Sequence, residues 1–218
     1  PVLLVKRTSK LFKKHKSKGL EYFSKEEMRL ILDDTCEGCT EKEMERFAFI
    51  NTYMHVAFLT GMRVGEISSL KISSICFETN LITVSTSVRK GIVGVTKTDS
   101  VRTIPMVDEL ATVLKKYIGD SKREYLFRNP RTGVIYRDTR SIVDTYYKPL
   151  LKRLKLPYRI LYSARHTFSS ISMESGVALS TISRCLGHQS TEITSRYYIK
   201  HSRSNKDLMK AQLESLSA

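Results

Sequence analysis

The sequence lacks a long hydrophobic run. Its most apolar stretch, residues 47–62, is interrupted by Asn51, Thr52 and His55, which predicts a buried helix and not a membrane span. The apolar residues 1–5 come before the first lysines, the reverse of the order in a secretory signal. These absences indicate a protein without a membrane partner that is located in the cytoplasm.

Cysteines are also few, and their spacing argues against a metal site. Of the four cysteines, only Cys36 and Cys39 lie close together, with the spacing of half a zinc knuckle. Such a site needs a second cysteine pair or a histidine pair, and none follows at a suitable distance. We therefore expect no metal and no cofactor, and we expect Cys36 and Cys39 to be thiols in a loop.

Acidic residues are scarce relative to basic ones. The chain has 22 Asp and Glu against 37 Lys and Arg, which gives a formal net charge of +15. This excess favours a polyanion as partner, with nucleic acid as the first candidate. An anionic membrane surface is the second, but it would require a basic amphipathic helix or an apolar span, so we expect no membrane partner. The 218 residues, 41% of them hydrophobic, are enough for one folded domain with a sizeable core.

The first 20 residues contain no acidic residue, and we interpret them as a basic linker or arm. Its lysines either contact nucleic-acid phosphates or form a solubilising tail, and the sequence supports both interpretations about equally. The candidate DNA-binding residues of this arm are Lys13, Lys14, Lys16 and Lys18.

Hydrophobic periodicity predicts an α+β fold that is mainly helical and contains a small sheet. Ser24 followed by two glutamates is typical of a helix start, and Gly61 is typical of a helix end. Helices are expected at residues 24–32, 41–60, 108–118, 139–154, 163–175, 178–186 and 191–199. Three runs rich in β-branched residues predict a three-stranded antiparallel sheet, at residues 81–88, 92–96 and 101–106.

The predicted organisation has three parts: an arm at residues 1–20, a domain at residues 21–200 and a tail helix at residues 201–218. In the tail, Met209 and Leu216 fall on one apolar helical face, which needs a surface to dock on. That surface belongs either to the same domain or to a neighbouring subunit.

Several residues are suited to phosphate chemistry. Arg63 and Glu66 are three residues apart, so on a helix they share a face and the carboxylate can hold the guanidinium for a phosphate. Arg165 begins a predicted helix, and His188 follows a glycine at a helix end. Lys97, between the second and third predicted strands, could protonate a leaving alkoxide.

Tyr197 follows His188 by nine residues, near the end of the predicted helix at 191–199. A free tyrosine has a pKa of about 10, so ionising it at pH 7 costs roughly 4 kcal/mol. Two arginines and a bound phosphate could offset part of that cost by stabilising negative charge as it develops. Tyr197 would then be a usable nucleophile that forms a covalent phosphotyrosine.

In combination these motifs resemble the tyrosine recombinases, or phage integrases, over roughly residues 21–200. Five motifs in the same order are a specific signal, whereas any one of them alone is weak. The motifs are Thr60-Gly61-x-Arg63-x-x-Glu66, Lys97 with Pro105 eight residues later, Arg165-His166-Thr167-Phe168, Leu186-Gly187-His188, and Tyr197. The resemblance implies the fold of that family's catalytic domain and the activity of a site-specific DNA recombinase or integrase.

The resemblance also implies a role for each matched residue. By this resemblance, Arg63 and Arg165 clamp the scissile phosphate, and Glu66 supports Arg63. His188 donates a hydrogen bond to a phosphate oxygen. Lys97 protonates the leaving 5′ oxygen, and Tyr197 attacks the phosphorus. The implied product is a 3′-phosphotyrosyl link with a free 5′ hydroxyl, formed without a metal.

Two positions leave alternatives open. The family commonly has a histidine three residues before the second arginine, and here that residue is Tyr162. Its phenol can donate a hydrogen bond to a phosphate but cannot supply imidazolium chemistry, so Tyr162 is either catalytic or a packing residue. Tyr198 offers a second hydroxyl beside Tyr197, although the spacing from His188 favours Tyr197.

The family's working unit is a tetramer on paired double-stranded DNA sites. We accordingly expect a homotetramer on DNA, or a monomer for the isolated domain, associated with the nucleoid. Full-length members usually carry a helical DNA-clamping domain before the catalytic one. Nothing of that size precedes residue 21, so the expectation is a fragment or a truncated member.

Two other functions fit the same residues. A type IB topoisomerase relaxes supercoils with a similar set and needs no paired target site. A catalytically inactive DNA-binding relative is the second alternative, with Tyr162 as a sign of decay. The five intact motif positions argue against the second, because decay has no reason to spare all of them.

Overall fold

The computed structural model describes residues 22–95, 101–130 and 132–188, and helices dominate these ranges. The helices are α1 (Lys25–Leu32), α2 (Glu41–Thr60), α3 (Val64–Ser68), η1 (Ile72–Ser74), α4 (Asp108–Ile118), α5 (Arg140–Ile142), η2 (Val143–Tyr147), α6 (Lys148–Arg153), α7 (Ser163–Glu174) and α8 (Leu179–Leu186). The expected helices at 41–60 and 108–118 are confirmed to the residue. Those expected at 191–199 and in the tail lie outside the described residues.

Helix α1 begins where its sequence predicts. The Ser24 hydroxyl accepts a hydrogen bond from the backbone N–H of Glu27 at 3.1 Å, and the Glu27 carboxylate accepts one from the backbone N–H of Ser24 at 2.8 Å. Each contact satisfies a backbone donor that the first turn leaves without a partner. Such a cap contributes about 1 kcal/mol to helix stability.

The helix expected at 139–154 is present in three consecutive segments, α5, η2 and α6. The middle segment is a π turn, in which the backbone N–H of Lys148 donates to the carbonyl of Val143. A π turn carries one more residue than an α turn. Tyr146 and Tyr147, which are adjacent in sequence, are both buried within it.

The α+β class is confirmed, but the strands pair differently from the expectation. The strands are β1 (Ile75–Cys76), β2 (Leu81–Val84), β3 (Thr86–Arg89), β4 (Ile92–Val95) and β5 (Arg102–Pro105). The three-stranded antiparallel sheet has the order β1-β2-β5, and β3 pairs only with β4 in a separate antiparallel ribbon. The single strand expected at 81–88 therefore breaks at Ser85, because its two halves pair with different partners.

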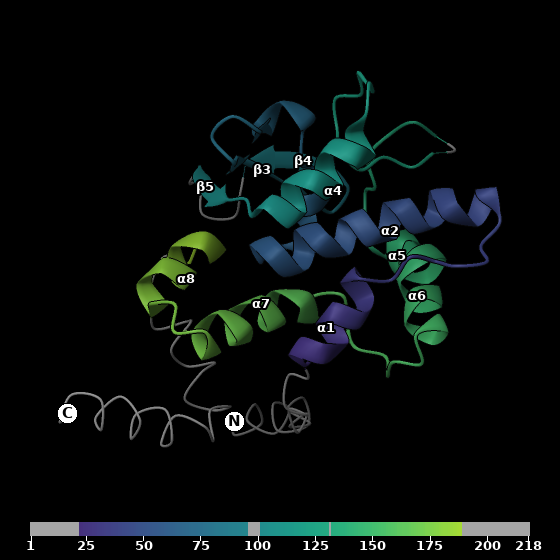
Figure 1. Ribbon diagram of the computed structural model, residues 1–218. Helices are drawn as coiled ribbons and strands as arrows, with labels where there is room; N and C mark the ends of the chain where they lie inside the picture. The colour runs from purple at the N-terminus through teal and green to yellow at the C-terminus, as the bar shows by residue number, and fades with distance from the viewer. Residues whose placement is uncertain (1–21, 96–100, 131, 189–218) are drawn as a thin grey trace, which may run out of the picture.

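Helix α2 is the centre of the fold. Figure 1 shows it between α4 on one side and α7 on the other, and both helices pack against it. From Phe49 to Thr60 nearly every side chain is buried, as expected of a helix that is covered on all sides. Its ring contacts include Phe49 against Tyr146, with ring centroids 4.4 Å apart. Full burial of each large apolar side chain contributes about 1.5–3 kcal/mol.

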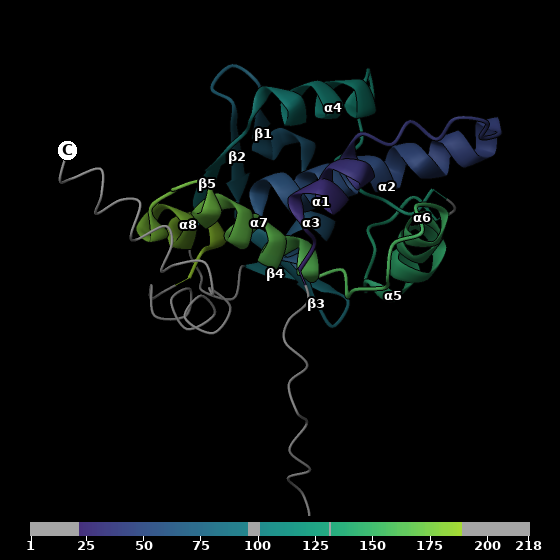
Figure 2. The same cartoon turned by 60° about the horizontal axis from the view of Figure 1, so that its bottom comes forward.

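Gly61 lies where the end of α2 meets the middle of α7 and the end of α8. It ends α2 in the left-handed conformation, with φ of 62°, which a glycine adopts without strain. A Cβ atom at this position would lie 2.5 Å from the Phe168 ring of α7 and 2.8 Å from the Leu186 side chain of α8. The end of α2 therefore lies directly against α7 and α8, which are side by side in Figures 1 and 2.

The expectation of two thiols at Cys36 and Cys39 was wrong, because a disulfide joins them. Their Cα atoms are 5.7 Å apart, within the range that a disulfide spans.

Within the described ranges, no helix is both long and apolar enough to cross a membrane.

Candidate functional site

The first part of the site is the short turn that links α2 to α3. Arg63 is the N-cap residue of α3, and Glu66 is its third residue. The backbone N–H of Arg63 donates to Glu66 Oε2 at 2.8 Å, and Arg63 Nη1 donates to Glu66 Oε1 at 2.9 Å. The carboxylate thus holds both the main chain and the side chain of Arg63.

Arg102, the first residue of β5, is a part of the site that the motifs in the sequence did not predict. Its Nη1 and Nη2 atoms donate to the two oxygens of Glu66 at 3.1 and 2.7 Å. Its Nε donates to the carbonyl of Cys185 in α8 at 2.7 Å. The Arg102 side chain is 7% exposed and that of Glu66 is 1% exposed, so this is a buried two-bond ion pair.

A signal for Arg102 was present in the sequence. Side chains alternate between the two faces of a strand, so Arg102 shares a face with Ile104, which is buried. An arginine on the buried face of a strand needs an acidic partner. Nothing in the sequence indicates that this partner is Glu66, 36 residues earlier.

Glu66 is ionised in spite of its burial. Burial raises the pKa of its carboxyl, but the hydrogen bonds and the charge of Arg102, together with the hydrogen bonds from Arg63, outweigh this effect. The pKa of Glu66 is therefore below its usual value. At neutral pH the carboxylate carries a full negative charge between two guanidinium groups.

Arg165 joins the two helix ends that meet at the site. From the first turn of α7, its Nη1 donates to the carbonyl of Gly61 at 2.7 Å, and its Nη2 donates to the carbonyl of Leu186 at 2.7 Å. The residue is 3% exposed, and burial lowers the pKa of its guanidinium to about 10, so it stays charged at pH 7. Within the described part of the chain, no carboxylate forms an ion pair with it.

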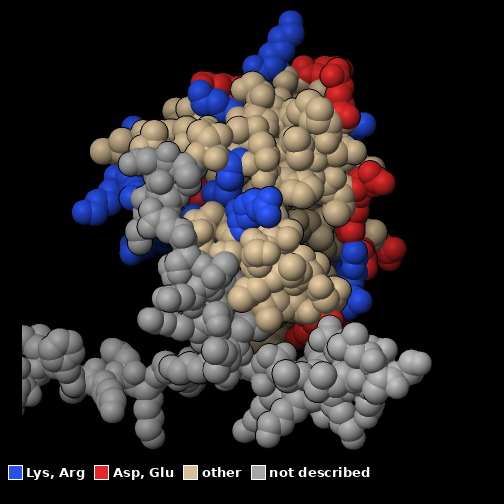
Figure 3. Space-filling view, turned by 90° about the vertical axis from the view of Figure 1, so that its left-hand side faces the viewer, with Lys and Arg blue, Asp and Glu red and all other residues tan. Residues whose placement is uncertain are grey.

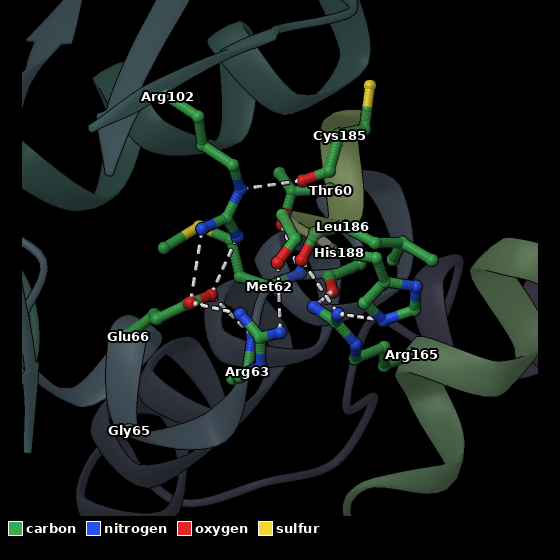
Figure 4. Close-up of polar contacts among 12 residues, drawn as sticks. Thr60, Met62, Arg63, Gly65, Glu66, Arg102, Arg165, Cys185, Leu186 and His188 are labelled. Atoms are coloured by element: carbon green, nitrogen blue, oxygen red, sulfur yellow. Dashed lines mark hydrogen bonds and ion pairs between the residues drawn. The ribbon is translucent and has the colours of Figure 1, made fainter. Parts of the chain in front are cut away.

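The C-terminal end of α8 is the point where all three arginines meet (Figure 4). Three successive backbone carbonyls each accept a hydrogen bond from a different guanidinium. In chain order they are the pairs Cys185 with Arg102, Leu186 with Arg165, and Gly187 with Arg63. These carbonyls carry the partial negative charge of a helix C-terminus, which favours cations. The helix end and the arginines therefore fix one another's positions.

His188, the next residue, is neutral in this arrangement. Arg165 Nη2 lies 2.9 Å from His188 Nε2, and since a guanidinium has no acceptor, the ring nitrogen accepts this hydrogen bond. Burial, followed by the charges of Arg165, Arg63 and Arg102, lowers the pKa of His188 to about 4. The imidazole proton is consequently on Nδ1.

Tyr162 lies beside this group, at the N-cap position of α7. Its ring meets that of His166 edge to face, with centroids 5.0 Å apart. Tyr162 also contributes to the electrostatic environment of Arg165, which is three residues further along the chain. Both the catalytic and the packing interpretations of Tyr162 fit this position.

The remaining predicted site residues lie outside the described residues. They are Lys97, Tyr197 with its neighbour Tyr198, and the arm residues Lys13, Lys14, Lys16 and Lys18. Of the residues assigned from the sequence, the structure therefore brings together Arg63, Glu66, Arg165 and His188, with Tyr162 beside them.

The charges of this cluster suit an anionic ligand. Arg63, Arg102 and Arg165 are three cations against one carboxylate, Glu66, and His188 adds no charge at pH 7. Figure 3 shows basic side chains near the middle of the face that carries α8, with the acidic ones along its edge. The described residues contain no group of three or more His, Cys, Asp and Glu side chains that could hold a metal ion.

Comparison with known proteins shows which proteins have similar sequences. The family model described as the phage integrase family matches residues 21–204. The XerC-like tyrosine recombinase of Caldanaerobacter subterraneus subsp. tengcongensis is 29% identical over 208 residues, which cover 82% of this chain and 50% of that protein. The tyrosine recombinase XerA of Pyrococcus furiosus is 31% identical over 150 residues, covering 65% of this chain and 48% of that protein. The chain thus spans about half the length of these curated relatives.

Solved structures share the fold. The Tn1549 transposon integrase in complex with a circular intermediate DNA has a TM-score of 0.74 at 19% identity, over 92% of this chain and 67% of that one. The XerA recombinase crystal structure has a TM-score of 0.67 at 25% identity, over 88% of this chain and 64% of that one. The helical domain with its small sheet is therefore the fold of these integrase and recombinase structures.

Proposed function

This chain belongs to the phage integrase family, and from that premise we propose that it cuts and rejoins double-stranded DNA as the catalytic domain of a site-specific recombinase. The observation that carries the proposal is Arg165. Its guanidinium is almost fully buried, and its hydrogen-bond partners among the described residues are all neutral. A buried cation without an anion is costly, and a DNA phosphate would supply the missing charge.

The charge of the cluster is matched to a phosphodiester under attack. Three guanidinium groups and one carboxylate leave a surplus of two positive charges. A phosphodiester carries one negative charge, and a second develops when a nucleophile adds to the phosphorus. Charges that are already in place stabilise the transition state more than the ground state, which is the requirement for catalysis.

In the proposed reaction, Arg63 and Arg165 hold the scissile phosphate and His188 donates a hydrogen bond to one of its oxygens. Tyr197 loses its hydroxyl proton to solvent, and its oxygen forms a bond to the phosphorus of the 3′ phosphate while the bond from that phosphorus to the 5′ oxygen breaks. Lys97 gives the leaving 5′ oxygen its proton. Rejoining follows the same steps in reverse, so the phosphotyrosyl bond conserves the energy of the broken one.

The proposal extends to the partner and to the assembly. Double-stranded DNA is the substrate, and the Tn1549 transposon integrase, which has a similar fold, is itself in complex with DNA in its solved structure. We propose a homotetramer on two DNA sites, at the nucleoid, with residues 21–200 as the catalytic unit. The arm at residues 1–20 would follow the DNA backbone, and the tail at 201–218 would dock on a domain or subunit.

Trapping of a covalent adduct tests this function. Nicked duplexes taken from the DNA that flanks the gene are incubated with the protein and separated under denaturing conditions, because a nick lets the short 5′ product diffuse away and prevents rejoining. We expect a protein–DNA adduct at a small number of sequences. Tyr197→Phe should abolish the adduct and leave DNA binding unchanged.

Tyr198→Phe is the matched control for this test. It removes the same hydroxyl group from the adjacent residue and should form the adduct at the normal rate. An adduct that persists in Tyr197→Phe and disappears in Tyr198→Phe would transfer the nucleophile to Tyr198. The absence of an adduct on every duplex, together with DNA binding, would contradict a cleaving enzyme.

A further inference from the structure

Arg102 connects the sheet to both phosphate-binding parts of the site, yet it takes no part in the proposed bond-breaking and bond-forming steps. We propose that Arg102 is a positioning residue, which sets the geometry of Arg63 through Glu66 and that of His188 through the end of α8. This inference rests on the proposed cleavage of DNA. It adds a third arginine to the residues that bring about cleavage, and this arginine acts without contacting the phosphate.

The orientation of the Arg102 guanidinium is fixed by its contacts. All three of its nitrogens donate to protein acceptors, two to the carboxylate of Glu66 and one to the carbonyl of Cys185. A guanidinium is planar, so three contacts in different directions leave it one orientation. Because every guanidinium nitrogen of Arg102 already has a protein acceptor, Arg102 acts through these partners and not as a direct ligand of DNA.

The first connection runs through Glu66 to Arg63. Each oxygen of Glu66 accepts one hydrogen bond from Arg102 and one from Arg63, at distances between 2.7 and 3.1 Å. The two bonds from Arg102 stop the carboxylate from rotating. The plane of this carboxylate in turn sets the direction in which the guanidinium of Arg63 points.

The second connection runs through α8 to His188. Arg102 donates to the carbonyl of Cys185, three residues before the histidine. It also lies directly under the following turn, since a Cβ atom at Gly187 would be 3.0 Å from Arg102 Nη1. Gly187 has a φ of 65° and ends α8, so its backbone directs the chain from the helix to His188. Arg102 therefore supports that turn.

The alternative is that Arg102 only stabilises the fold. A buried ion pair often contributes little net stability, while loss of one partner leaves the other charge buried without compensation. Both roles would therefore reduce the yield of active protein in an Arg102 variant. They differ in the rate constant, because a fold that is merely less stable leaves the remaining folded molecules at full speed.

The test measures single-turnover adduct formation on a nicked duplex with which the unaltered protein reacts, with protein in excess and saturating. We expect Arg102→Met to lower the first-order rate constant by about a hundredfold while the Kd for DNA changes by less than about threefold. Arg102→Lys should recover part of the rate, to within about tenfold, because an ammonium keeps the charge but not the three fixed contacts.

Two further variants separate positioning from stability. Arg29→Met removes another two-bond arginine–carboxylate pair, a more exposed one with Glu109 at 2.8 Å and away from the site, and should leave the rate constant unchanged. Arg102 acts on Arg63 through Glu66, so the effects of Arg102→Met and Glu66→Gln should not be independent. The fold reduction of the rate constant in the double variant should therefore be smaller than the product of the fold reductions in the two single variants.

Three outcomes have distinct meanings. An Arg102→Met protein with a lower adduct yield but a normal rate constant would overturn the inference in favour of a stabilising role. A large increase in Kd at an unchanged rate constant would overturn it in favour of direct DNA binding. Absence of adduct with the unaltered protein would instead count against the proposed function, so the two failures are distinguishable.

Discussion

Three guanidinium groups within one cluster create an unusual environment for the adjacent histidine. Burial and the charges of Arg165, Arg63 and Arg102 all disfavour protonation of His188, and only Glu66 opposes them. Protonation would add a fourth cation to the group. His188 consequently serves as a neutral hydrogen-bond partner in the DNA-free protein, and not as an acid.

The titration of His188 can be measured directly. We predict a pKa of about 4 in the DNA-free protein, well below the ordinary value of 6.5, with the neutral ring protonated on Nδ1. Nitrogen chemical shifts of labelled histidine, recorded from about pH 3 to about pH 8 and assigned with His188→Asn, report both properties. A midpoint near 6.5 would contradict the partly buried, arginine-lined environment.

The sequence predicted contacts within this cluster only where they are local. Arg63 and Glu66 are neighbours on one helical turn, so their spacing was enough to expect the pair. Arg102 lies 83 residues from Cys185, and its contacts depend on how β5 packs against α8. No spacing rule in the chain encodes such a contact, and only the folded backbone reveals it.

At the scale of the elements, the glycine at the end of α2 determines how three helices meet. Gly61 combines a left-handed backbone with close approach to Phe168 and Leu186, and its carbonyl accepts from Arg165. A side chain at this position would separate α2 from α7 and α8. Loss of this packing would displace Arg165 relative to Arg63.

Gly61→Ala should therefore destabilise the protein more than the same substitution at a glycine with open space around it. Gly176→Ala is the matched control, because Gly176 also has a positive φ, of 80°, but a Cβ atom there would have nothing within 4 Å. The backbone strain costs about 1–2 kcal/mol in both variants. Overpacking against Phe168 should add about 1–3 kcal/mol in Gly61→Ala alone. Urea unfolding measures both, and equal losses would contradict the packing account.

The elements differ in how far the sequence determines them. Helices α2 and α4 were predicted to the residue because their signals, caps and periodicity are local. The run at 81–88 was correctly expected to be extended, but its partners were not identified. Strand pairing is set by contacts between distant segments, and here one run divides at Ser85 between β5 and β4.

At the scale of the whole molecule, the buried His55 and the partly buried His188 should make the fold sensitive to acid. Partial burial, followed by the charges of three arginines, lowers the pKa of His188 to about 4, and burial lowers that of His55. When pH falls below 6.5, the unfolded chain binds protons that the folded chain excludes, so stability is lost between about 6.5 and about 4. Stability is complete above that range.

We therefore predict that the melting temperature falls steadily as pH is lowered from 7 to 4.5. His188→Gln should show a smaller fall, because glutamine does not titrate and the remaining change then comes from His55 and the carboxylates. Thermal unfolding followed by circular dichroism measures this. The same pH dependence in both proteins would show that His188 is not held neutral by the fold.

An arginine cluster and a tyrosine that together cleave DNA without a metal are the centre of the proposed mechanism. The most direct test identifies the bond that forms, by digesting the adduct made on a nicked duplex in the presence of EDTA and sequencing the modified peptide by mass spectrometry. We predict an undiminished yield, with Tyr197 linked to the 3′ end of the cut strand and a free 5′ hydroxyl on the other product. A requirement for a divalent metal, or a protein bond to the 5′ end, would contradict this mechanism.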